Sequence, residues 1–245
     1  MPQQFSISDW QAFAPGIHDR AGWEAWARAP SLLRGEDTPT LREMPPLQRR
    51  RVDRLGRMAL QVAYWCQGDT AADVPQVFAS RHGDAARTLE MLLALAREEP
   101  FSPTQFGLST HNAIAAQYGI ARKLVSNSLT VAAGAATAEA AFVEALGLLA
   151  EGAAEVLVVV YDGRLPTVYQ AYADEPDSDY AWACRVAPVG DEQRGYSLTV
   201  APAGSSTPTR RQLPHGLEVL QFLIAGSGTL ALQEAACCWC WRRHD

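Results

Sequence analysis

The sequence has 245 residues, of which 48% are hydrophobic and 20% are charged. This composition is sufficient for one sizeable core, and we expect a single domain over residues 1–245. The formal net charge of −6 argues against binding to nucleic acid or to an anionic membrane surface. No secretory leader is evident and no apolar run approaches the roughly 20 residues that cross a bilayer, so a cytoplasmic protein is expected. Five cysteines without the spacing of a disulfide framework predict free thiols.

Helix-like and strand-like hydrophobic periods alternate along the chain. The expected elements, in chain order, are a strand at 5–13, a Gly/Pro-rich loop to about 46, a helix at 47–64, a strand at 74–80, helices at 84–98 and 102–118, a strand at 124–131, a helix that ends at Gly152, a strand at 156–161, strands at 180–189 and 195–202, a helix at 217–224 and a final strand in the Cys/Trp tail. This order predicts an α/β fold in which helices pack on a mixed sheet.

Two features of this pattern predict how strands pair. The unbroken apolar run at 156–161 is typical of a central parallel strand that is buried on both faces. The runs at 180–189 and 195–202 are separated by Gly190-Asp-Glu-Gln-Arg194, which predicts that they form a β-hairpin.

The stretch from Ser128 to Phe142 leaves a strand, turns through a glycine and enters a helix. Enzymes often display a nucleophile in this arrangement, because the helix N-terminus stabilises a thiolate or an oxyanion. Here residues 131–136 are only Val, Ala and Gly, and Thr137 is the nearest hydroxyl. A threonine without a base is a poor nucleophile, so a cap or packing role is expected for Thr137.

Three segments resemble the β-ketoacyl synthases of the thiolase fold. They are residues 101–120, with Ser-Pro and a helix that contains Asn-Ala; residues 129–137, Leu-Thr-Val-Ala-Ala-Gly-Ala-Ala-Thr; and residues 155–162, Glu-Val-Leu-Val-Val-Val-Tyr-Asp. The motif-bearing core covers about 74–202. The resemblance implies about one half of a thiolase-like fold, in which Ala135, with its neighbours Gly134, Ala136 and Thr137, occupies the place of the family's active cysteine. The five histidines fall in none of the family's histidine motifs, so condensation by the family mechanism is not expected.

Synthase-like chains without the cysteine are known as chain-length factors, which pair with an active ketosynthase and shape its acyl tunnel. This sequence is most similar to the short β-ketoacyl synthase-like proteins that accompany ketosynthases in bacterial aryl-polyene and xanthomonadin-type pigment clusters. The resemblance therefore implies a non-catalytic subunit of a heterodimer, which an acyl carrier protein would visit, and no cofactor.

The resemblance also implies candidate residues for these roles. The strand that would pair across the dimer axis is Ser126, Asn127, Ser128, Leu129, Thr130 and Val131. Candidates for the tunnel lining, on one face of the 102–118 helix, are Gln105, Leu108, Ser109, Asn112 and Ala113. Ordinary core packing is the plainer interpretation of that face. On the arginine-rich helix, Arg50 and Arg54 are candidates for docking of an acidic carrier protein, although a solvated face is the commoner use of such arginines.

Two other functions stay open. One is a homodimeric scaffold that binds acyl groups without a ketosynthase partner. The other is a thioesterase or acyltransferase that uses Ser109 or Thr137 with His111, which is disfavoured because residues two apart on a helix point to different faces. The tail cysteines at 237, 238 and 240 have no second pair, so they are expected to pack in a strand and no metal site is expected.

Overall fold

A computed structural model describes residues 4–68, 73–100, 102–190, 195–203, 211–226, 228–234 and 236–244. The strands are β1 (Gln4–Phe13), β2 (Gln76–Ala79), β3 (Ser128–Val131), β4 (Val156–Asp162), β5 (Tyr180–Pro188), β6 (Tyr196–Pro202), β7 (Thr229–Gln233) and β8 (Cys237–Arg243). The helices are α1 (Arg20–Arg28), α2 (Pro46–Arg49), α3 (Arg54–Gln67), α4 (Ala85–Ala96), α5 (Pro103–Ser109), α6 (Ala113–Arg122), η1 (Gly134–Ala136), α7 (Thr137–Ala150), η2 (Thr167–Tyr172) and α8 (His215–Ala225).

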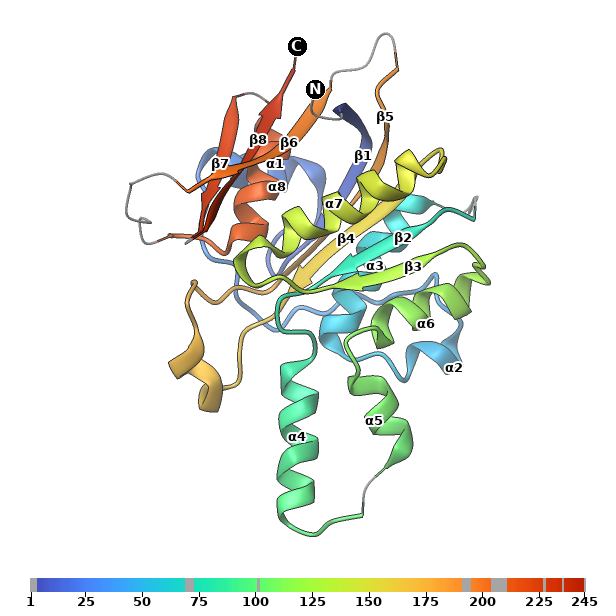
Figure 1. The fold of residues 1–245 in the computed structure, drawn as a ribbon. Helices are drawn as coiled ribbons and strands as arrows, with labels where there is room; N and C mark the ends of the chain where they lie inside the picture. Colours follow the sequence, from blue (N-terminus) through green and yellow to red (C-terminus); the bar gives the residue numbers. More distant parts are fainter. Residues whose placement is uncertain are drawn as a thin grey trace.

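All of these strands join one mixed sheet, in the order β3-β2-β4-β5-β1-β6-β8-β7. Helices α1, α7 and α8 pack on one face, and α3 and α6 pack on the other (Figure 1). Alternate residues of β4 enter the two cores, with Val156, Val158 and Val160 on the α7 side. Leu157, Val159 and Tyr161 lie on the α3 side. The expected α/β fold with a mixed sheet between helices is confirmed, and it follows from apolar strands that have two faces to bury.

Strand pairing differs from expectation at two places. β5 and β6 do not pair with each other, because β1 inserts between them and pairs antiparallel with both. The predicted hairpin is therefore wrong, because β1 occupies the strand edges through which β5 and β6 would have paired with each other. β4 is parallel to β2 but antiparallel to β5, so only one of its neighbours is parallel. Of the turn predicted between the two runs, residues 191–194 lie outside the described residues.

Helix boundaries also depart from the sequence pattern. The loop expected before residue 46 contains α1, which Asp19 caps and which buries Trp23 and Trp26. The helix expected at 47–64 is divided into α2 and α3, because the Asp53 side chain accepts the Gly56 N–H and starts a new helix. β7, which pairs with the predicted tail strand β8, was not expected from the sequence.

The helix expected at 102–118 is likewise two helices. Thr110 has an extended backbone at the end of α5, and the hydroxyls of Ser109 and Thr110 donate to carbonyl oxygens one turn back. Such local bonds compete with the helical ladder and favour a break. The second helix, α6, runs past the expected cap at Gly119 and ends at the left-handed residue Lys123.

A buried ionic bridge joins the first turns of α7 and α8 to β8. His215 is 1% exposed, and its Nε2 lies 2.5 Å from Glu139 Oε1 while its Nδ1 lies 2.8 Å from Glu218 Oε2. The Trp241 indole donates to the same Glu139 oxygen at 2.8 Å. Burial lowers the pKa of His215, but the hydrogen bonds from its ring to Glu139 and Glu218 outweigh burial and raise it overall. The His215 ring therefore ties the buried Glu139 of α7 to the partly exposed Glu218 of α8.

Replacing His215 with leucine is expected to lower the free energy of unfolding by about 3–5 kcal/mol, because Glu139 would remain as a buried charge without its partner. The pKa of His215 is higher in the folded protein than in the unfolded chain, where it is about 6.5. The stabilisation that His215 gives to the folded state is therefore complete below about pH 6.5 and is lost as the pH rises through the folded pKa. Denaturant unfolding at about pH 6 and about pH 9 measures both effects. The control is His18→Leu, whose side chain is 65% exposed; equal losses in the two variants would contradict the bridge.

Candidate functional site

The elbow between β3 and α7 keeps its turn but holds no nucleophile. Gly134 has a φ of +57°, a left-handed backbone that glycine adopts without strain. Ala135 is half-buried at this turn. The Thr137 hydroxyl donates to the Gly134 carbonyl oxygen at 2.7 Å and accepts the Ala133 N–H at 3.0 Å. Thr137 is therefore a cap that closes the elbow.

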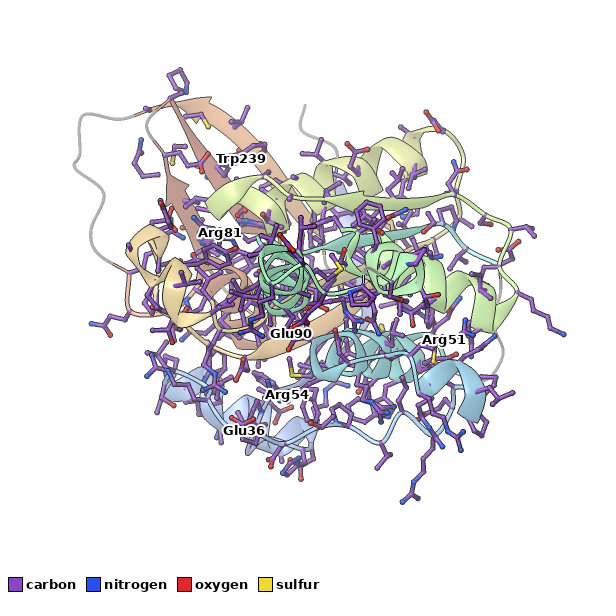
Figure 2. The ribbon with its side chains drawn as sticks, turned by 90° about the horizontal axis from the view of Figure 1, so that it is seen from below. Glu36, Arg51, Arg54, Arg81, Glu90 and Trp239 are labelled. Atoms are coloured by element: carbon purple, nitrogen blue, oxygen red, sulfur yellow. The ribbon has the colours of Figure 1, made fainter. Side chains whose placement is uncertain are left out.

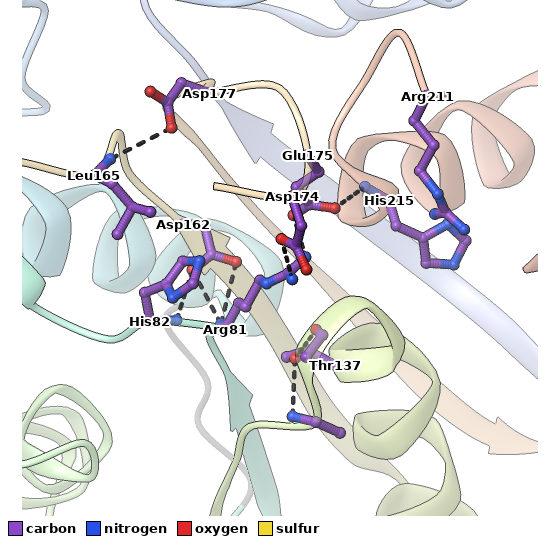
Figure 3. Close-up of polar contacts among 12 residues, drawn as sticks. Arg81, His82, Thr137, Asp162, Leu165, Asp174, Glu175, Asp177, Arg211 and His215 are labelled. Carbon is purple, nitrogen blue, oxygen red and sulfur yellow. Dashed lines mark hydrogen bonds and ion pairs between the residues drawn. The ribbon is translucent and has the colours of Figure 1, made fainter. Parts of the chain in front are cut away.

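A buried carboxyl group organises the turn beside the elbow. Asp162, at the end of β4, accepts a hydrogen bond from the Ser80 hydroxyl at 2.8 Å. It also accepts the Arg81 N–H at 3.0 Å (Figure 3). The Tyr180 hydroxyl also donates to it, at 3.4 Å. Burial, which the bonds from Ser80 and Arg81 offset only in part, raises the pKa of Asp162 to about 7. The Asp162 side chain thus fixes the turn at residues 80–83 through hydrogen bonds to Ser80 and Arg81.

The cluster around Asp162 is linked to the ionic bridge through Arg81. The Arg81 guanidinium pairs with Asp174 and lies 3.1 Å from Glu175. Glu175 in turn accepts the backbone N–H of His215 at 3.2 Å. A polar network therefore connects the end of β2 to the start of α8. Asp162 could have been singled out in the sequence, because it ends an unbroken apolar strand; Arg81 carries no comparable signal.

A cleft of about 1,060 Å³ opens at the carboxyl ends of β2 and β4, between α4 and the segment from Gly163 to Thr167. Ligands of parallel sheets bind at this kind of edge. On one wall Arg87 clasps two carboxylates, with Nη2 2.8 Å from Asp53 and Nε 2.8 Å from Asp84. Burial and the neighbouring Asp53 raise the pKa of Asp84 to about 6. Gln105 of α5 accepts from the same guanidinium at 2.7 Å, so this clasp holds α4 and α5 to the body.

β3 is an edge strand in the described part of the chain, paired in parallel with β2 alone. The carbonyl groups of Asn127 and Val131 accept the N–H groups of Gln76 and Ser80, so the odd-numbered residues of this segment face β2. Because peptide groups alternate along a strand, those of Ser128 and Thr130 face outward. Ser126 and Asn127, which were expected to belong to the pairing strand, precede it.

Helices α4 and α5 stand away from the body as a projection (Figure 1). Neither helix contains a buried residue. The exposed large apolar side chains on them are Leu92, Leu93, Leu95 and Phe106. These four side chains give the projection an exposed apolar surface. The projection follows β2 directly, and β3 is the strand beside β2, so the free edge and this apolar surface belong to one region of the molecule.

The structure distributes the candidate tunnel residues over two helices. Gln105, Leu108 and Ser109 lie on α5, with Gln105 exposed and the other two half-buried. Asn112 is the exposed N-cap of α6, and Ala113 is buried on that helix. The single helical face expected for all five residues does not exist, because of the break at Thr110. Leu108 and Ser109 lie on α5, next to the apolar surface of the projection.

The two arginine candidates do not share a surface. Arg50 is exposed at the end of α2. Arg54 instead donates to the Gly35 carbonyl oxygen at 2.7 Å and pairs with the buried Asp179 at 3.4 Å. In Figure 2, Arg51 lies well to one side of Arg54. Arg54 thus lines the cleft and holds its wall, which leaves Arg50 and Arg51 as the accessible pair.

The side chains considered for a hydrolase or acyltransferase are occupied elsewhere. Ser109 Oγ donates to the Phe106 carbonyl oxygen at 2.8 Å, and His111 Nε2 contacts the Ser80 carbonyl oxygen at 2.8 Å. Thr137 is held within its own turn. A nucleophile needs a base within hydrogen-bond reach, and neither hydroxyl has one among its bonds in the structure.

Within the described residues, no group of three or more His, Cys, Asp or Glu side chains is arranged to hold a metal ion. No helix in the same part of the chain is long and apolar enough to cross a membrane.

Comparison with known proteins identifies the family of this chain and solved structures with a similar fold. The family model described as "Beta-ketoacyl synthase, N-terminal domain" matches residues 23–242. No curated protein matches the sequence. One similar solved chain comes from the structure described as "Ketosynthase (ApeO) in Complex with its Chain Length Factor (ApeC) from Xenorhabdus doucetiae". It has 27% identity and a TM-score of 0.81, over 98% of this chain and 99% of that chain.

Two more distant structures agree in fold. "The ishigamide ketosynthase/chain length factor" matches with 18% identity and a TM-score of 0.65, over 81% of this chain and 67% of that one. A chain of the complex described as "AntDE:AntF (apo): type II PKS acyl-carrier protein in complex with its ketosynthase bound to the hexaketide" matches with 11% identity and a TM-score of 0.64, over 83% and 70%. The expected thiolase-like ketosynthase fold is confirmed, and the chain belongs to the β-ketoacyl synthase N-terminal domain family.

Proposed function

We propose that this chain is a non-catalytic, chain-length-factor-like subunit that pairs through β3 with an active β-ketoacyl synthase and shapes its acyl tunnel in aryl-polyene biosynthesis. The observation that carries the proposal is the elbow. It keeps the strand, the left-handed glycine and the helix of a nucleophile turn, yet its half-buried position holds Ala135. The free edge of β3 and the apolar projection supply a surface for a partner that brings the chemistry.

Pairing across a two-fold axis suits the exposed groups of this edge. Within the described sheet, the outward peptide groups of Ser128 and Thr130 have no partner strand. They belong to a short strand without charged residues, which is a template for antiparallel pairing with a second strand. The apolar side chains of α4 and α5 would be covered in the same event. A similar solved chain belongs to a structure whose description names a ketosynthase and its chain length factor, which supports this assignment.

The pairing strand can be tested without damage to the fold. Thr130→Pro removes an N–H that faces outward, while the hydrogen bonds from β3 to β2 involve the odd-numbered residues. We expect the variant to keep its unfolding transition but to lose co-purification with a ketosynthase encoded beside its gene. Thr130→Ala, which retains the N–H, is the matched control and should co-purify as a 1:1 complex.

The same experiment separates the remaining candidates. A homodimer of this chain that forms whether or not the ketosynthase is present would favour the scaffold function. An acyl adduct on this chain alone, seen by mass spectrometry, would favour a thioesterase or acyltransferase. A Thr130→Pro variant that still co-purifies would contradict pairing through β3.

The emptied elbow can be tested by restoring a thiol. In a background without the three tail cysteines, Ala135→Cys is expected to be alkylated by iodoacetamide at a lower pH than Ala133→Cys, because the start of α7 stabilises a thiolate at the elbow. The pH dependence of the alkylation rate gives the two thiol pKa values. Equal thiol pKa values in the Ala135→Cys and Ala133→Cys variants would contradict the assignment of Ala135 to the nucleophile position of the elbow. No condensing activity is expected in either variant.

Leu108 is the proposed end wall of the tunnel. Leu108→Ala should shift the products of the co-expressed complex towards longer chains, since the partner's tunnel would gain the volume of the removed side chain. Product lengths by mass spectrometry check this, with Val200→Ala, an exposed residue of β6 outside the projection, as the control. An unchanged length distribution from an intact complex would remove Leu108 from the wall.

The exposed arginines that follow α2, Arg50 and Arg51, are proposed to attract an acidic acyl carrier protein. The double variant Arg50→Glu and Arg51→Glu should slow transfer of the chain from the carrier to the complex, most strongly at low ionic strength. Arg97→Glu, on an arginine that is exposed beyond α4, serves as the control. Identical transfer rates at low salt for all three proteins would show that the carrier binds elsewhere.

A further inference from the structure

The tail strand β8 presents two thiols on one face. The Sγ atoms of Cys238 and Cys240 lie 3.7 Å apart and are not joined in a disulfide. The alternating residues Trp239 and Trp241 belong to the opposite face, where Trp241 is fully buried against Phe142. The sequence predicted that these cysteines pack as small apolar groups. The structure instead leaves both partly accessible on the outer face of the sheet.

The neighbours of the two thiols leave room above them. Cys238 lies opposite Ala201 of β6, and Cys240 lies opposite Ala231 of β7. Directly opposite residues of antiparallel strands share a face, so the two alanines flank the thiols. Both alanines are exposed. The other two cross-strand neighbours are Thr199 of β6, opposite Cys240, and Gln233 of β7, opposite Cys238. Each thiol therefore has an alanine on one side and a larger polar residue on the other, and the space for a bound ion and its solvent ligands lies on the alanine side.

The separation of the sulfur atoms suits one ion. In a tetrahedral thiolate site the metal–sulfur distance is about 2.3 Å, which puts two ligand sulfurs about 3.8 Å apart. The observed distance of 3.7 Å between the two Sγ atoms already matches this sulfur–sulfur separation, so the strand would not have to change. A disulfide would need the sulfurs to approach to about 2.05 Å between residues two apart in an extended strand, which strand geometry opposes.

We propose that Cys238 and Cys240 form a two-thiolate site for a thiophilic divalent cation of the zinc and cadmium class. The chain supplies two of the four tetrahedral ligands, and water or a small thiol supplies the others. Each cysteine loses its thiol proton to solvent when its sulfur binds the cation. The site lies towards the β7 edge of the sheet, while β3 forms the opposite edge, so its occupation is independent of the proposed ketosynthase pairing. In Figure 2, Trp239 marks β8 at a distance from Arg54 and the cleft.

The other cysteines serve as internal references. Cys66 and Cys184 are buried, and Cys237 Sγ contacts Glu234 at 3.9 Å instead of joining the pair.

Titration of the full chain with Cd²⁺ tests the proposal, since cadmium thiolates show a charge-transfer absorbance in the ultraviolet. We expect one Cd²⁺ per chain and a band that Cys237→Ser retains. Cys238→Ser and Cys240→Ser should each weaken binding by at least about tenfold. In the unaltered chain, Zn²⁺ should protect two thiols from a disulfide reagent, a readout that requires no variant. Absence of the band, or equal affinity in all three variants, would overturn the site.

Discussion

The structure depends on the parallel pairing of β2 with both β3 and β4. Parallel strands end at the same edge of a sheet, so this pairing brings together the elbow after β3, the turn after β2 and Asp162 at the end of β4. The same arrangement leaves β3 at the edge, with β2 as its single neighbour in the described sheet. The turn between β3 and α7 and the exposed edge strand β3 are therefore consequences of one topological constraint, and they lie on the same side of the molecule.

The polar groups near that edge maintain its shape. Thr137 closes the elbow, Asp162 fixes the turn at 80–83, and Arg87 clasps the base of the α4–α5 projection through Asp53 and Asp84. These bonds hold the backbone geometry of the elbow, although residues 131–136 carry no reactive side chain. This explains how a chain of the β-ketoacyl synthase family can hold an elbow without a nucleophile.

Local signals in the sequence predict much of this fold, and non-local competition accounts for the rest. The apolar run at 156–161 and the strand–glycine–helix at 128–142 are local patterns, and the structure contains both. The hairpin prediction failed because β1, far away in the sequence, takes the edges of β5 and β6. The helix breaks at Asp53 and Thr110 depend on single side-chain bonds that periodicity cannot detect. The clasp of Arg87 joins three segments, so no local pattern predicts it; a single domain over residues 1–245 stays a prediction.

The central claim is that this chain supplies structure while its partner supplies chemistry. The most direct test is intact mass spectrometry of the co-expressed complex after incubation with acyl-loaded carrier protein. The account predicts a 1:1 complex in which the ketosynthase chain gains the acyl mass and this chain gains none. An acyl adduct on this chain, or the absence of a complex between two folded proteins, would contradict it.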